Sequence, residues 1–189
     1  LADSISAEAI YGHISNWDVS SVTDMSELFL SASNFNSNIS SWDVSGVTNM
    51  SYMFGFSSSF NGDISGWDVS NVTNMIYMFS SADAFNGDIS QWDVSNVSDM
   101  SFMFSSADAF NSDISGWDVS SVTNMGYMFG SADAFNQDLS SWDISSLTAS
   151  WGMFYYTPSL SDENKCAIQE SFSSNSNWPY DWSSYWTRW

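Results

Sequence analysis

Apolar and polar positions along the chain follow one pattern that returns every 25 residues. Counted from tryptophan as column 1, a unit reads W-D-V-S-x-V-T-N-M-x-x-M-F-x-x-A-x-x-F-N-x-D-I-S-x, without insertions. The opening tryptophan recurs at Trp17, Trp42, Trp67, Trp92, Trp117 and Trp142. A constant period of this size is typical of a repeat protein in which equal coils stack and bury one continuous core.

Two hydrophobic spacings within the unit predict two kinds of element. Residues 67–70 alternate apolar and polar, which predicts a short strand. Met75, Met78 and Phe79 have the i, i+3, i+4 spacing of a helical turn, and Asn74 can cap it. We therefore expect an α/β repeat solenoid: a leucine-rich-repeat-like, right-handed coil with short parallel strands, short helical or 3₁₀ turns, and about six coils.

The regularity of the pattern divides the chain into three parts. Residues 17–154 are expected to form the repeat solenoid, and residues 1–16 an N-terminal cap with a degenerate coil. Residues 155–189 are expected to form a C-terminal cap and aromatic tail, with a short helix over 161–173 covering the last coil. The end of the tail can instead reach a neighbouring subunit, and four residues are candidates for self-association: Trp182, Tyr185, Trp186 and Trp189.

The pattern I-S-x-W-D-V-S-x-V-T-N-M-x-x-M-F-x-x-A-x-x-F-N-x-D, over about residues 10–154, resembles the BspA-like leucine-rich-repeat surface proteins. It looks most like their 25-residue branch, noted in mycoplasma lipoproteins as a domain of unknown function. The resemblance implies a curved solenoid displayed on cell surfaces, with adhesion or protein binding attributed to some members. It implies no single reaction or ligand.

Composition narrows the class of protein. Two Lys and Arg residues against 22 Asp and Glu give a formal net charge of -20, which excludes nucleic-acid binding. Aromatic residues make up 17% of the chain, which argues against disorder. No apolar run approaches the roughly 18 residues of a membrane span. The scarcity of basic residues favours an extracellular or cell-surface location.

Two acidic columns stack into ladders if the coils are in register. Like charges about 5 Å apart cost about 3–4 kcal/mol at an effective dielectric constant of 20, so the repulsion must be relieved. Hydrogen bonds from turn N–H groups with open solvent are one means, and calcium between the carboxylates is the other. No cofactor is required, and the candidate calcium ligands are Asp43, Asp68, Asp93 and Asp118 in column 2 and Asp63, Asp88, Asp113 and Asp138 in column 22.

Three further columns carry candidate surface chemistry. Column 11 is expected to form an aromatic stripe toward solvent, suited to sugar or protein contact, unless each ring covers the one below. Its members are Tyr52, Tyr77, Phe102 and Tyr127. The threonine column has one hydroxyl in each coil, whereas an ice-binding face usually has paired rows of hydroxyls. The asparagine column is expected to form an inward ladder that satisfies backbone groups. Sequons that permit glycosylation occur at Asn38, Asn49, Asn71 and Asn96.

The sequence contains no catalytic constellation. Its one histidine, His13, replaces an aspartate of the ladder, and the carboxylates have the same neighbours coil after coil. We expect a non-enzymatic extracellular or cell-surface protein that mediates adhesion, or binds protein or glycan on a cell surface, through its repetitive faces. The alternatives are a structural subunit that self-assembles into a filament or surface layer, and a calcium-stabilised or ice- or mineral-binding solenoid.

Overall fold

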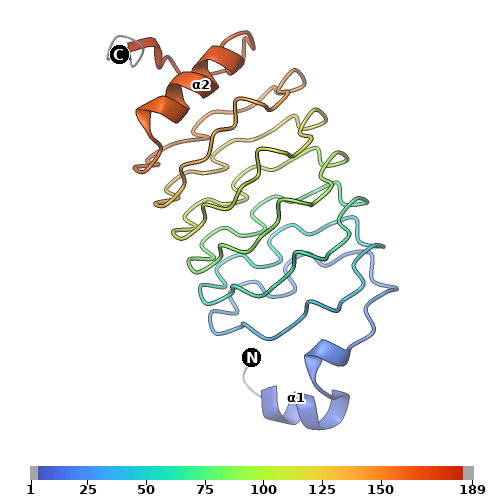
Figure 1. Cartoon of the computed structure of the whole chain (residues 1–189). Coiled ribbons are helices and arrows are strands. Elements are labelled where there is room, and N and C mark those ends of the chain that lie inside the picture. The colour runs from blue at the N-terminus through green and yellow to red at the C-terminus, as the bar shows by residue number, and fades with distance from the viewer. Residues whose placement is uncertain (1–3, 185–189) are drawn as a thin grey trace.

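The chain folds into a stack of coils with a helix at each end (Figure 1). The computed structural model describes residues 4–184. Helix α1 spans Ser4–Tyr11, the 3₁₀ helix η1 spans Ile14–Asn16, and helix α2 spans Asp162–Phe172. Residues 17–161, between η1 and α2, are turns and connecting segments. None of the helices in residues 4–184 is long and apolar enough to cross a membrane.

The predicted leucine-rich-repeat-like α/β fold is wrong. Within residues 4–184 neighbouring coils form no sheet, and their strand-like pairing is limited to isolated parallel β-bridges along column 8, such as Asn49 with Asn74. Backbone N–H groups of the expected strand are used inside its own coil. The N–H of Trp67 bonds to the Ile64 carbonyl at 3.2 Å, and that of Ser70 bonds to the side chain of Asp68 at 3.0 Å. Such local bonds compete with strand pairing.

The expected helical turns are also absent, and a different backbone pattern takes their place. Tyr77 and Ser81 have left-handed φ values of 56° and 54°, which a right-handed helix excludes. Backbone N–H groups alternate between acceptors in the next coil and in their own coil. The N–H groups of Met75 and Tyr77 donate to carbonyls of the next coil, at 3.2 and 3.0 Å. The N–H of Met78 bonds to the Met75 carbonyl, three residues back, at 3.2 Å. In columns 9–15 each coil is therefore a chain of β-turns that bonds to the next coil through every second N–H.

The core contains the columns that the hydrophobic spacing indicates, so this part of the prediction is confirmed. In the third coil the buried side chains are Trp67, Val69, Val72, Met75, Met78, Phe79, Ala82, Phe85 and Ile89. The Phe79 ring lies 5.5 Å from Phe54 and 5.6 Å from Phe104, nearly parallel to both. The buried Trp92 indole donates to the Ile64 carbonyl at 3.2 Å. Equal unit length thus gives a continuous stack of like side chains.

The asparagine column satisfies backbone groups as expected, although the side chains of Asn36, Asn61, Asn86 and Asn136 are exposed, where an inward ladder was expected. The Asn36 side-chain oxygen accepts the backbone N–H of Asn61 at 2.9 Å, and Asn61 does the same for Asn86 at 3.0 Å. At the last coil the Asn136 side chain accepts the N–H of Ser161 at 2.9 Å, just before α2. These bonds carry the register of the coils into the C-terminal helix.

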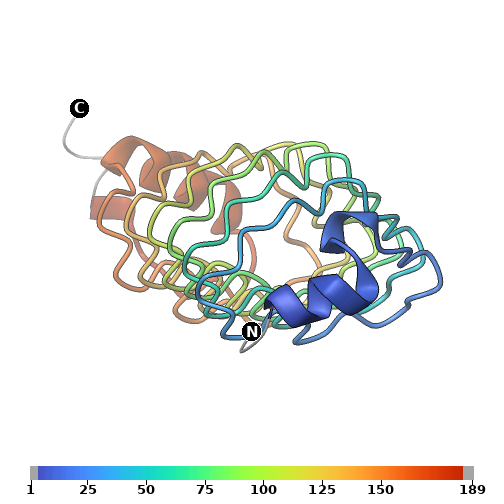
Figure 2. The same cartoon turned by 90° about the horizontal axis from the view of Figure 1, so that it is seen from below.

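Helix α2 and the segment after it cover the last coil. The Ser161 hydroxyl caps α2 by accepting the N–H of Asn164 at 3.2 Å. The α2 side chains Ile168 and Phe172 are fully buried. The sequence prediction of a short helix over 161–173 is confirmed. Seen from below, helix α1 lies across only part of the first coil (Figure 2).

Candidate interaction surfaces

The acidic ladder of column 2 is exposed and hydrogen-bonded within its own coils. The Asp68 carboxylate accepts both the backbone N–H and the hydroxyl of Ser70, at 3.0 and 2.6 Å. The same pair of bonds joins Asp43 to Ser45 and Asp93 to Ser95. The hydroxyl and N–H of Ser70 hold the pKa of Asp68 below its ordinary value. The Asp68 carboxylate therefore keeps its charge to lower pH than a free aspartate does, and the serine bonds hold all three carboxylates in fixed orientations.

The ladder of column 22 has the same local geometry. The Asp88 carboxylate accepts the N–H and hydroxyl of Ser90 at 3.0 and 2.7 Å. These two bonds lower the pKa of Asp88. The backbone N–H and hydroxyl of Ser65 likewise lower the pKa of Asp63, while the neighbouring Asp88 charge raises it in part. Local donors therefore outweigh the repulsion between coils.

Calcium ligation requires several oxygen atoms around one point. In the part of the chain that the structure describes, no three carboxylate, imidazole or thiol groups lie together in such an arrangement. One oxygen of each candidate calcium ligand already accepts hydrogen bonds from the serine two residues on, as in Asp43, Asp118, Asp113 and Asp138.

A third acidic column, at Asp83, Asp108 and Asp133, was missed by the sequence reasoning. Partial burial raises the pKa of Asp108, and the charges of Asp133 and Asp83 raise it further. This column has no serine two residues on to donate a hydrogen bond, because alanine and phenylalanine follow. The repeated A-D-A-F of three successive units was the available signal. At Asp108 the neighbouring charges are therefore not offset by a local donor.

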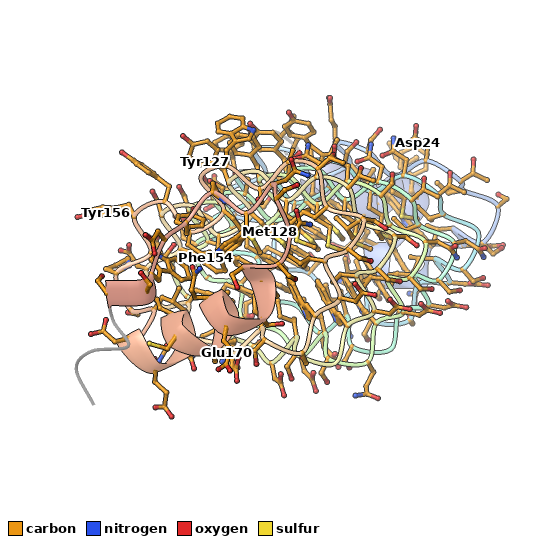
Figure 3. All side chains as sticks on the ribbon, turned by 90° about the horizontal axis from the view of Figure 1, so that it is seen from above. Asp24, Tyr127, Met128, Phe154, Tyr156 and Glu170 are labelled. Atoms are coloured by element: carbon orange, nitrogen blue, oxygen red, sulfur yellow. The ribbon has the colours of Figure 1, made fainter. Side chains whose placement is uncertain are left out.

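The aromatic column forms a row of stacked, half-buried rings. Tyr52 and Tyr77 have ring centroids 4.6 Å apart, and Tyr77 and Phe102 4.4 Å apart, with the planes nearly parallel. Tyr127 continues the row at 5.1 Å and meets the edge of Trp151 at 4.8 Å (Figure 3). Each ring thus covers the next, which is the second of the two expected arrangements. Ring faces inside the row are taken by neighbours, so sugar stacking on them is blocked.

The aromatic tail residue Trp182 packs on its own chain. Its ring lies 5.6 Å from Phe154 and 4.8 Å from Tyr180. Tyr180 lies against the same core, and its hydroxyl accepts the Phe154 N–H at 2.8 Å. Burial raises the pKa of Tyr180 to about 12. The other three candidates for self-association, Tyr185, Trp186 and Trp189, lie outside the described residues.

Side chains of the sequon and threonine columns bond along the stack. The side-chain nitrogens of Asn71 and Asn96 each donate to a serine carbonyl of the preceding coil at 2.8 Å. Asn38 and Asn49 accept the N–H of the serine two residues on, at 3.0 and 3.1 Å. The Thr73 hydroxyl donates to the Thr48 carbonyl at 3.2 Å.

The N-terminal end of the stack is an apolar surface that the sequence pattern did not indicate. Leu28 is 48% exposed and Trp17 40% exposed, beside a cavity of about 680 Å³. Tyr11 and Val22 also line this cavity. The available signal was the change of residue in the first unit, where Glu27 and Leu28 replace the aromatic residue and methionine of later coils.

Turn-built coils, a stacked aromatic core and exposed acidic ladders define a repeat protein. The chain belongs to the family described as Mycoplasma protein of unknown function, DUF285, whose model matches residues 3–108 and 87–178. The membership confirms the repeat family, although the finer BspA-like assignment is not confirmed. No curated protein and no solved structure matches the chain.

Proposed function

We propose that the protein is a non-enzymatic binding protein of the cell exterior that presents its acidic ladders to a basic protein partner. The observation that carries the proposal is the exposure of two carboxylate columns along the stack. Their orientation is held by serine donors, as in Asp68 and Asp88. A preorganised array of one charge attracts a complementary partner and speeds encounter.

A protein partner is favoured over a glycan by the aromatic row. Sugar recognition by stacking needs an open ring face, and the rings of Tyr77 and Phe102 lie between their neighbours. Two basic side chains in the whole chain offer few competing internal partners for the ladders. Within each ladder the carboxylates have the same serine donors in successive coils, which supports binding over catalysis, because acid–base chemistry needs two neighbouring groups in contrasting environments.

The test compares two variants of equal net charge in binding to a lysine-rich peptide. One variant changes four ladder residues to asparagine: Asp43, Asp68, Asp93 and Asp118. Asparagine preserves the local fold, since Asn38 accepts the Ser40 N–H in the same way at 3.0 Å. The control removes four exposed carboxylates outside the ladders: Glu8→Gln, Glu163→Gln, Glu170→Gln and Asp181→Asn.

In calorimetry at low salt, the lysine-rich peptide is expected to bind to both the parent protein and the control variant. The ladder variant should bind about 10-fold more weakly or worse, because exposed ion pairs contribute about 0.2–1 kcal/mol each. Binding of the parent should weaken as salt is added. Equal losses in both variants would mean that net charge alone attracts the peptide, and the proposal would then be rejected.

A further inference from the structure

The first coil ends the stack with a row of backbone carbonyls that lack the partners found elsewhere. At each junction, alternate N–H groups of the earlier coil donate to four carbonyls of the later coil. In the second coil these acceptors belong to Asn49, Ser51, Met53 and Gly55. The matching carbonyls of the first coil belong to Asp24, Ser26, Leu28 and Leu30. Within residues 4–184 no backbone N–H donates to these four.

Apolar side chains beside this row are exposed, whereas the same columns are buried one coil further on. Trp17 is 40% exposed against 5% for Trp42, and Leu28 is 48% exposed against 0% for Met53. The cavity of about 680 Å³ opens beside both side chains. Helix α1 covers only part of the coil at this end (Figure 2). The core of the stack thus continues to the molecular surface here.

We propose that this edge, the carbonyls of 24–30 with the side chains of Trp17 and Leu28, is a docking site for a polypeptide segment of the same repeat. This edge continues the interface that already joins each pair of neighbouring coils. Columns 9–15 of such a segment supply N–H groups at alternate positions, together with methionine and phenylalanine side chains for the cavity. Recognition of this kind resembles strand addition, in which backbone bonds give affinity and pockets give specificity.

A second copy of this protein is a poorer match for the edge. Two first coils placed face to face would oppose two rows of carbonyls and supply no donors. In the complementary donor edge, at the last coil, the Phe154 N–H is already taken by the Tyr180 hydroxyl at 2.8 Å, and the Phe154 ring packs against Trp182, so the full row of donors is not open to a second copy. The occupant is therefore a repeat segment whose own donor edge is uncovered.

The experiment adds a peptide of residues 69–82 to the full chain and measures binding by calorimetry. A saturable one-to-one complex is expected. N-methylation of the peptide at Met75, Tyr77 and Phe79 removes three of the four donors of the proposed ladder, and should weaken binding at least about 10-fold. Methylation at Asn74 is the matched control, because the Asn74 N–H donates no backbone hydrogen bond in the stack.

Two protein variants locate the complex on the molecule. Leu28→Asp places a charge on the apolar edge and should weaken binding at least about 10-fold. Tyr156→Asp puts the same charge on a 72% exposed side chain at the opposite end and should bind like the parent. Both positions are exposed, so both variants should keep the parent melting temperature. If Leu28→Asp does not fold, Leu28→Ala serves instead, with a smaller loss expected.

Three results would overturn the inference. The first is no binding of the peptide at about 1 mM, where even a weak complex forms. The second is equal binding of the peptide methylated at three donors, because the complex would then not use the ladder. The third is a dimer of the free protein by light scattering that Leu28→Asp dissociates, because a second copy would then occupy the edge. None of these results bears on binding by the acidic ladders.

Discussion

The aspartate of each ladder acts as a local turn residue as well as a surface charge. Its carboxylate accepts the N–H and hydroxyl of the serine two residues later, a bond pattern typical of aspartate in turns. The D-x-S spacing therefore predicts this part of the site correctly. The contrasting environment of Asp108 was not predicted, because it depends on burial and on Asp83 and Asp133 in neighbouring coils.

Removing one serine hydroxyl should change the titration of its aspartate. Ser70→Ala takes away the hydroxyl, the largest of the causes that lower the pKa of Asp68, and should raise that pKa toward its ordinary value. The control is Thr73→Ala, whose hydroxyl bonds to the Thr48 carbonyl instead of a carboxylate. Carbon-detected NMR titration of the Asp68 carboxyl measures the change. An unchanged Asp68 pKa in Ser70→Ala would contradict this account.

Stability is expected to fall in acid. Serine hydroxyls and N–H groups lower the folded-state pKa of Asp18, Asp43, Asp68 and Asp118 below the unfolded value of about 3.9. Such groups stabilise the fold above that value, and the contribution is lost as pH falls through the folded pKa. Asp108, with its raised pKa, acts in the opposite direction. Urea unfolding between pH 7 and pH 2 measures the trend, and higher stability at pH 2 would contradict it.

At the scale of the coil, spacing predicted which side chains face inward but not the backbone that places them. The i, i+3, i+4 spacing of Met75, Met78 and Phe79 fits a helical turn, yet successive β-turns bury the same three side chains. Left-handed φ favours glycine and asparagine, so tyrosine in column 11 does not indicate it. This backbone is favoured because alternate N–H groups then bond to the next coil. Such bonds join two units, so the sequence of a single unit does not indicate them.

Glycine in place of a left-handed serine should stabilise the coil. Ser106 has φ of 56°, and an L-residue in this region costs about 1–2 kcal/mol, against about 0.5–1 kcal/mol for the added freedom of glycine. Ser106→Gly should therefore raise the free energy of unfolding by about 0.5–1 kcal/mol. In the control Ser121→Gly, whose φ is not positive, the stability should fall by a similar amount. Urea unfolding measures the free energy of unfolding of both variants. A lower value in both would refute the explanation by left-handed φ.

At the scale of the whole molecule, the two ends of the stack differ. The last coil is covered by α2 and the aromatic residues Trp178, Tyr180 and Trp182, whereas the first coil keeps an apolar edge beside α1. The sequence predicted the C-terminal helix. It did not show that only one end is closed, because closure depends on where the terminal segments pack, not on their composition.

Tyr180 is expected to be the residue that completes the covered end. Tyr180→Phe removes the acceptor of the Phe154 N–H and should lower the free energy of unfolding by about 1 kcal/mol. Hydrogen exchange of the Phe154 amide should accelerate, because fraying of this end becomes easier. Tyr156→Phe is the control, since its side chain is 72% exposed. Unchanged exchange at Phe154 would show that the cap does not depend on this bond.

The constant 25-residue spacing also affects how the chain finds its native state. The same hydrogen bond recurs at successive junctions: the N–H of Thr73 donates to the Thr48 carbonyl, and the N–H of Thr123 donates to the Ser98 carbonyl. A coil that pairs with the coil one unit too far along therefore keeps almost every bond. The intervening unit would then loop out of the stack. Only the terminal segments and irregular residues such as Glu27 distinguish the correct alignment. The same tolerance means that the loss or duplication of a whole unit leaves a foldable chain, so the length of the stack can change in evolution without a new core.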